Sequence, residues 1–223
     1  MRESSRQTAA VDHSSSILEI ILASRSPRRR ELLALLVPAE AIRVMPPANA
    51  DEAGFHGLNS LAEIERQLLS IATAKRDDVL NQLGEERSRC CVIAADTVVV
   101  VGEQDGARQV LGQPPERDWQ STARRWFLEH YAGRTHLVLT GLSVAAPHRQ
   151  IERIIASRVT FRSDVEVDLD WYLATGEPQG KAGGYAIQGL GSLFVERVEG
   201  SLTNVVGLPL EELRRILCDL RVD

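Results

Sequence analysis

A buried strand, a turn with two serines and the start of a helix follow one another in Ile20-Ile21-Leu22-Ala23-Ser24-Arg25-Ser26-Pro27-Arg28-Arg29-Arg30-Glu31-Leu32-Leu33. Ser26 is a good helix N-cap and Pro27 a good first helical residue. The arginines that follow oppose the helix dipole, because the N-terminus of a helix is already partly positive. Together with unpaired backbone amides, however, they make a strong anion site. Taken alone, the stretch is equally compatible with a solvated basic turn that Glu31 balances.

Asp96 stands in the middle of a second apolar run, which covers residues 91–101. Such a continuous run is typical of a strand that is covered on both faces. An ionised carboxylate there costs on the order of several kcal/mol unless it is paired or bound to a metal. The position therefore predicts a catalytic base or a metal ligand. The alternative is an aspartate near the end of the strand that pairs with a nearby arginine.

A glycine-rich segment, Gly176-Glu177-Pro178-Gln179-Gly180-Lys181-Ala182-Gly183-Gly184-Tyr185-Ala186-Ile187-Gln188-Gly189-Leu190-Gly191, holds the second candidate site. Its glycines permit a positive φ and a close approach of the backbone to a ligand. Lys181 among them indicates a phosphate-binding nest, although the Gly-Lys-Ser/Thr ending of a Walker A loop is absent. The amide of Gln188 offers a donor and an acceptor, which suits the imide edge of uracil or thymine. A flexible connector with a surface glutamine is the alternative.

The remaining pattern predicts an α/β fold with a mixed sheet, arranged as two lobes around a central cleft. A helix capped by Asn59 or Ser60 runs through the apolar positions 61–72, with Lys75 near its end. Residues 137–146 and 151–161 form a hairpin, residues 186–188 and 193–198 form short strands, and residues 208–220 form a closing amphipathic helix. We expect a tail at residues 1–16 and one domain over residues 17–223.

Composition restricts the classes of function. The formal net charge of -5 argues against a general nucleic-acid coat and against an anionic-membrane binder. The apolar runs are too short to span a bilayer, and the polar N-terminus has no signal-peptide pattern, so we expect a cytoplasmic protein. Among 26 basic residues, Lys75 and Lys181 are the only lysines. Where arginine has replaced lysine so widely, these two positions favour a need for a compact ammonium group.

Four motifs, in this order, resemble the Maf family of nucleoside triphosphate pyrophosphatases, also described as septum-formation inhibitors. They are Ser24-Arg25-Ser26-Pro27-Arg28-Arg29, Ala95-Asp96-Thr97, Lys181-Ala182-Gly183-Gly184-Tyr185-Ala186-Ile187-Gln188-Gly189 and Val206-Gly207-Leu208-Pro209-Leu210. The resemblance implies the two-lobed mixed α/β architecture shared with inosine triphosphate pyrophosphatases, and it allows a homodimer. It also implies hydrolysis between the α and β phosphates, which yields a monophosphate and pyrophosphate.

The resemblance also assigns roles to residues. Asp96 becomes the proton acceptor, and Arg28, Thr97 and Gln188 become the positions that discriminate the base, in the combination typical of the dTTP and UTP branch. The substrate-binding residues implied by motif and charge are Ser24, Arg28, Arg29, Lys75, Thr97, Lys181 and Gln188. Asp96 and Glu52 would hold the divalent cation, Mg²⁺ or Mn²⁺.

Two positions depart from the family pattern. Gln113 stands in Leu111-Gly112-Gln113-Pro114 where the family usually has lysine, and Gly180 stands before Lys181 where it usually has aspartate. One charge of each sign is therefore lost. These departures keep open a second hypothesis, a nucleotide-binding regulator of cell division with little turnover. A third is a sugar-nucleotide transferase that uses the same anion site.

Overall fold

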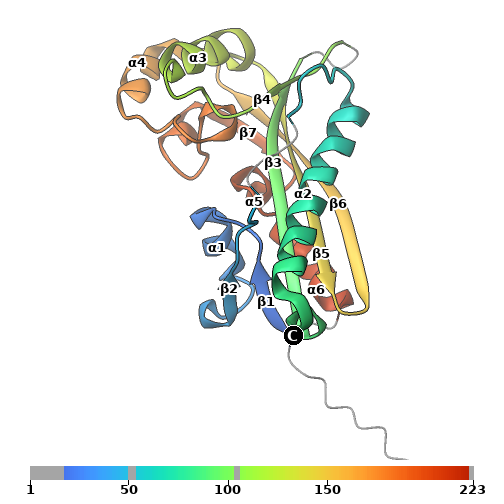
Figure 1. Cartoon of the computed structure of the whole chain (residues 1–223). Helices are drawn as coiled ribbons and strands as arrows, with labels where there is room; N and C mark the ends of the chain where they lie inside the picture. Colours follow the sequence, from blue (N-terminus) through green and yellow to red (C-terminus); the bar gives the residue numbers. More distant parts are fainter. Residues whose placement is uncertain (1–17, 50–53, 103–105, 221–223) are drawn as a thin grey trace, which may run out of the picture.

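The computed structural model describes residues 18–49, 54–102 and 106–220 (Figure 1). The predicted tail at residues 1–16 and the predicted metal ligand Glu52 lie outside the described residues. Within them no helix is both long and apolar enough to cross a membrane.

The described strands form one seven-stranded sheet in the order β2-β1-β3-β5-β6-β7, with β4 also paired to β3. Their bounds are β1 Glu19–Leu22, β2 Ile42–Val44, β3 Cys90–Val101, β4 Gln109–Leu111, β5 Thr135–Ala146, β6 Arg149–Phe161 and β7 Val195–Glu199. β1 runs parallel to β2 and β3, while the other pairs are antiparallel. The sheet is therefore mixed, as the sequence predicts.

One edge of β3 is open in the middle. On that edge β1 pairs with β3 from Cys90 to Ile93, and β4 pairs with it from Val99 to Val101. Among the described residues no strand pairs with residues 94–98 there. The opposite edge of β3 is paired with β5 from Val92 to Val100. Asp96 and Thr97 lie at the centre of the gap, so the end of β1 and the start of β4 leave room for a site.

One face of the sheet carries α2, Leu61–Leu83, which lies along β3 and β5 (Figure 1). Ser60 caps the helix in a capping box with Glu63. The expectation that Lys75 lies near the helix end is wrong. Val79 and Leu83 are buried and continue the apolar spacing beyond Lys75, so the lysine lies well inside the helix.

The other face carries two hydrophobic clusters. One cluster joins β1, α1 (Pro27–Leu33) and α6 (Leu210–Asp219). The other, rich in aromatic residues, joins α3 (Trp119–Trp126), the π-helix η3 (Phe127–Tyr131) and α4 (Glu166–Ala174). Figure 1 shows α3 and α4 at one end, α1 at the other and α5 (Leu202–Val206) between them. This arrangement gives the two predicted lobes.

Short helical turns complete the chain: η1 Ala39–Ala41, η2 Gly84–Arg89, η4 Ala182–Gly184 and η5 Leu190–Phe194. The predicted strand at residues 186–188 is wrong, because the amide of Gly189 bonds to the carbonyl of Ala186 and closes a turn. The last helix begins two residues later than predicted, and the pattern did not indicate α5 before it. Gly207, with a φ of 125°, separates α5 from α6.

Candidate active site

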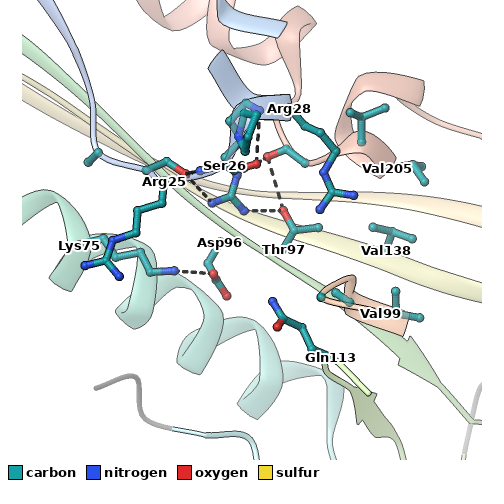
Figure 2. Close-up of a pocket in the computed structure, with 18 of the residues that line it drawn as sticks. Arg25, Ser26, Arg28, Lys75, Asp96, Thr97, Val99, Gln113, Val138 and Val205 are labelled. Carbon is teal, nitrogen blue, oxygen red and sulfur yellow. Dashed lines mark hydrogen bonds and ion pairs between the residues drawn. The ribbon is translucent and has the colours of Figure 1, made fainter. Parts of the chain in front are cut away.

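A cavity of about 720 Å³ opens at the gap in the edge of β3 (Figure 2). The loop between β1 and α1 forms one side, and Lys75 of α2 forms another. Asp96 and Thr97 of β3, the loop around residues 180–185 and the turn at residues 205–207 complete the lining. Segments far apart in the sequence therefore meet at this point.

Asp96 and Lys75 form an ion pair, with 2.6 Å between Lys75 Nζ and Asp96 Oδ1. Each side chain is only 15% exposed, so the pair is largely withdrawn from water. The alternative interpretation of Asp96 expected an arginine as its partner. The structure places a lysine there instead. A mostly buried carboxylate beside one ammonium, facing a cavity, has the position required of a general base.

Thr97 also lines the cavity, although neighbouring residues of a strand point to opposite faces. The side chains of Asp96 and Thr97 can reach the same cavity because no described strand covers this edge of β3 at the two residues. The Oγ1 of Thr97 lies 2.9 Å from Thr140 Oγ1 and accepts from Arg29 Nη2 at 3.2 Å. Its hydroxyl is therefore held in place by the surrounding protein.

The two serines organise the loop between β1 and α1. Ser26 is the N-cap of α1, and its side chain accepts from the amide of Arg29 at 3.4 Å, as the sequence predicts. Ser24 Oγ accepts from the amide of Ser26 at 3.1 Å and from Arg29 Nη1 at 3.4 Å. Ser24 is buried, so its hydroxyl shapes the turn on which the arginines are placed.

Arg29 borders the cavity, but its guanidinium is bonded within the protein. Nε donates to the carbonyl of Gly207 at 2.9 Å, and Nη1 donates to the carbonyl of Ala95 at 2.7 Å. With the contact to Thr97, this side chain joins the α1 lobe, β3 and the α5–α6 turn. The structure therefore gives Arg29 an organising role beside the substrate-binding role predicted from the sequence.

Arg28 and Arg25 line the cavity as well. In Figure 2 the guanidinium of Arg28 lies toward Thr97 and Val205, whereas Arg25 extends toward the helix that carries Lys75. Sequence reasoning missed Arg25. Its position between the two serines of the loop that leaves β1 is the signal that could have indicated it.

The two residues predicted in the glycine-rich loop lie differently. Lys181 is next to the cavity, since both Gly180 and Ala182 line it, and its Nζ donates to the carbonyl of Glu177 at 2.6 Å. Burial lowers the pKa of Lys181, and the charge of Arg28 lowers it further. Gln188 is exposed and does not belong to the described lining, so its base-reading role stays a prediction.

Gln113 does line the cavity, and Figure 2 shows its amide on the side opposite the arginines. One of the two departures from the family pattern thus lies inside the site. Near Arg28 the lining becomes apolar, with Val99, Val138 and Val205. These three positions belong to apolar runs, and the sequence alone does not separate them from ordinary core residues.

Among the described lining residues Asp96 is the single acidic side chain. The described part of the chain holds no cluster of three or more histidine, cysteine, aspartate or glutamate side chains able to bind a metal ion. This donor set suits Mg²⁺ or Mn²⁺ bound largely through substrate phosphates, because such cations often take only one or two protein carboxylates.

Comparisons with known proteins agree with this geometry. The family described as Maf-like protein matches residues 19–220. The "dTTP/UTP pyrophosphatase" of Anaeromyxobacter dehalogenans is 41% identical, over 89% of this chain and 92% of that protein. Proteins of the same name from Caldicellulosiruptor bescii and Moorella thermoacetica are 39% and 40% identical, each over 92% of this chain and 96% of the relative. The chain therefore belongs to the Maf family.

Proposed function

We propose that this protein is a nucleoside triphosphate pyrophosphatase that hydrolyses dTTP and UTP to the monophosphate and pyrophosphate. The observation that carries the proposal is the Asp96–Lys75 pair, which faces a cavity lined by arginines at the open edge of β3. The names of the relatives in three bacteria support the choice of substrate.

The reaction needs positioned charges more than covalent chemistry. A water oxygen attacks the α-phosphorus, and its proton passes to the carboxylate of Asp96. The bond between the α-phosphorus and the oxygen that bridges to the β-phosphorus then breaks, and that oxygen leaves with pyrophosphate. Lys75 holds Asp96 at 2.6 Å and keeps its carboxylate oriented toward the cavity.

We propose that a divalent cation binds at this site. Asp96 would supply one carboxylate oxygen, and Glu52 would be the second ligand, as the sequence predicts. When bound, Mg²⁺ or Mn²⁺ would neutralise charge on the phosphate oxygens. Burial and the charge of Arg28 lower the pKa of Lys181, and a bound anion beside it would favour its protonated form.

The nucleobase of the substrate would bind near Arg28, away from the phosphates. Val99, Val138 and Val205 form an apolar surface there, while Arg28 and the held hydroxyl of Thr97 supply polar groups. Base sites combine such apolar surface with a few fixed polar atoms. Gln188 would complete this recognition only after moving from the exposed position that it occupies here.

The first test is to incubate the purified protein with UTP, dTTP, CTP, GTP and 7-methyl-GTP, each with Mg²⁺ or Mn²⁺, and to resolve pyrophosphate from phosphate. Pyrophosphate from UTP and dTTP, abolished in Asp96→Asn, supports the proposal. Binding without turnover by the unmodified protein would instead favour the regulator of cell division. Pyrophosphate that appears only with an added sugar phosphate would favour the transferase.

We expect the enzyme to act in the cytoplasm on free nucleotides, without nucleic acid or membrane partners. A homodimer stays a prediction that sedimentation or light scattering would decide.

A further inference from the structure

We propose that Arg25 is a further substrate-binding residue, which holds the β- and γ-phosphates and thereby the departing pyrophosphate. This inference rests on the proposed function for its substrate. Arg25 is exposed, lines the cavity and lies on the loop that leaves β1.

Three cations at or beside the cavity are already bonded to other groups of the protein. Arg29 donates to the carbonyls of Gly207 and Ala95. Lys75 is paired with Asp96, and Lys181 donates to the carbonyl of Glu177. In the part of the chain that the structure describes, by contrast, no hydrogen bond or ion pair joins the guanidinium of Arg25 or Arg28 to another residue.

The guanidinium groups of Arg25 and Arg28 lie at different ends of the cavity (Figure 2). Arg28 lies at the apolar end, with Val138 and Val205, while Arg25 extends toward Lys75 at the other end (Figure 2). Asp96 lies between the two ends. A nucleotide with its base on the apolar surface and its α-phosphorus at Asp96 therefore directs its β- and γ-phosphates toward Arg25 and Lys75.

Pyrophosphate carries most of the charge of the reaction's products, and charge increases on the bridging oxygen as its bond to the α-phosphorus breaks. A guanidinium binds phosphate oxygens through two parallel N–H groups, which an ammonium cannot do. Arg25 therefore favours a triphosphate over a diphosphate, because only a triphosphate has both the β- and γ-phosphates and releases pyrophosphate.

The test compares Arg25→Ala and Arg25→Lys with Arg30→Ala. Arg30 is an exposed arginine of α1, the helix that follows the loop of Arg25, and it does not belong to the described lining, so this control removes the same charge nearby. Calorimetric titrations with pyrophosphate and, separately, with UMP are run in the presence of Mg²⁺. We expect Arg25→Ala to weaken pyrophosphate binding about tenfold or more while UMP binding changes less than about twofold.

Turnover gives a second measurement. Arg25→Ala should lower kcat/KM for UTP about tenfold or more and lower kcat/KM for UDP, which lacks the γ-phosphate, by a smaller factor, with Arg25→Lys between Arg25→Ala and the unmodified protein. Equal effects of Arg25→Ala and Arg30→Ala, or an equal loss of UMP and pyrophosphate binding, would overturn the role of Arg25. If the unmodified protein hydrolyses nothing, the proposed function fails, and the titrations still decide whether Arg25 binds pyrophosphate.

Discussion

Arg29 Nη1 donates to the carbonyl oxygen of Ala95 at 2.7 Å, at the edge of β3 where no described strand is paired. A side chain thus takes the place of the strand that would otherwise satisfy this carbonyl. Because the bond is made by a guanidinium and not by a neighbouring backbone, the edge stays open enough for Asp96 and Thr97 to face a cavity. The anion site and the gap in the sheet therefore depend on the same loop.

Replacing Arg29 should cost stability as well as activity. Arg29→Ala leaves the carbonyls of Ala95 and Gly207 without these donors, and each such loss costs about 1–3 kcal/mol when the group is buried. Urea unfolding should therefore show a decrease of about 2–4 kcal/mol, whereas Arg30→Ala should stay within about 0.5 kcal/mol of the unmodified protein. Arg29→Lys at full stability would contradict the role of the guanidinium fork.

Lys75 and Asp96 should have different kinetic signatures. Asp96→Asn removes the proton acceptor and should lower kcat by about 10²–10⁴ with little change in nucleotide affinity. Lys75→Met keeps the acceptor but removes its 2.6 Å partner, so both kcat and KM should change. Steady-state kinetics and equilibrium titration of each variant with UTP separate the two. An Asp96→Asn protein with undiminished pyrophosphate release would exclude Asp96 as the base.

The sequence predicts those parts of the fold that depend on local pattern. The apolar run of β3 and the hairpin of β5 and β6 follow from periodicity, and the N-cap Ser26 follows from residue type. The partners of Arg29 do not follow, because Gly207 lies 178 residues away and Ala95 lies 66 residues away. Arg25, Arg28 and Arg29 all line the cavity, and tertiary contacts decide that the guanidinium of Arg29 is the one bonded within the protein.

The glycine-rich loop shows the same limit. Its glycines and Lys181 indicate a ligand loop, yet Gln188 is exposed while Gln113 lines the cavity. Residue type does not separate the two glutamines. Gln188 lies in the turn closed by Gly189 and Ala186, where it is exposed and outside the described lining. The expected position of Lys75 near a helix end is likewise wrong, because Val79 continues the buried face of the helix beyond it.

Glu177 should be a positioning residue for this loop. Its carboxylate accepts from the amides of Leu190 at 2.8 Å and Gly191 at 2.9 Å, and from the hydroxyl of Tyr172 at 3.1 Å. Glu177→Ala should therefore raise KM for UTP and cost about 1–3 kcal/mol of stability. Glu177→Gln should recover part of both, because it keeps one oxygen acceptor.

A matched control for Glu177 is Glu196→Ala, since Glu196 is exposed on β7 and no hydrogen bond of its carboxylate is present among the described residues. If Glu177→Ala and Glu196→Ala have the same KM and the same urea midpoint, the loop does not depend on the Glu177 carboxylate.

Gly183 tests how closely the loop approaches β3. Its φ is 70°, and an added Cβ would lie 2.6 Å from Val99 Cγ2 and 2.7 Å from the Tyr131 hydroxyl oxygen. That hydroxyl also donates to the Gly183 carbonyl at 2.8 Å. Gly183→Ala should therefore destabilise the protein by about 1–3 kcal/mol through strain and contact.

The measurement is thermal unfolding of Gly183→Ala compared with Gly180→Ala. A Cβ at Gly180 meets nothing within 4 Å, although the φ of Gly180 is also positive. Similar melting temperatures for both variants would show that the contact with Val99 is relieved by small shifts.

Below neutral pH, His136 should make stability fall. Burial lowers the pKa of His136 to about 3, and its Nε2 lies 2.8 Å from the hydroxyl of Tyr185 in the aromatic cluster. The unfolded chain, with an ordinary histidine pKa of about 6.5, binds a proton that the folded chain does not. The contribution of neutral His136 is thus fully present above about pH 6.5 and is lost toward pH 3, at up to about 1.4 kcal/mol per pH unit.

The double variant His136→Phe with Tyr185→Phe removes both polar partners and should flatten this slope in urea unfolding between pH 6.5 and 4.5. His148→Gln, at the exposed turn between β5 and β6, should keep it. An unchanged slope in the double variant would assign the acid sensitivity to other groups.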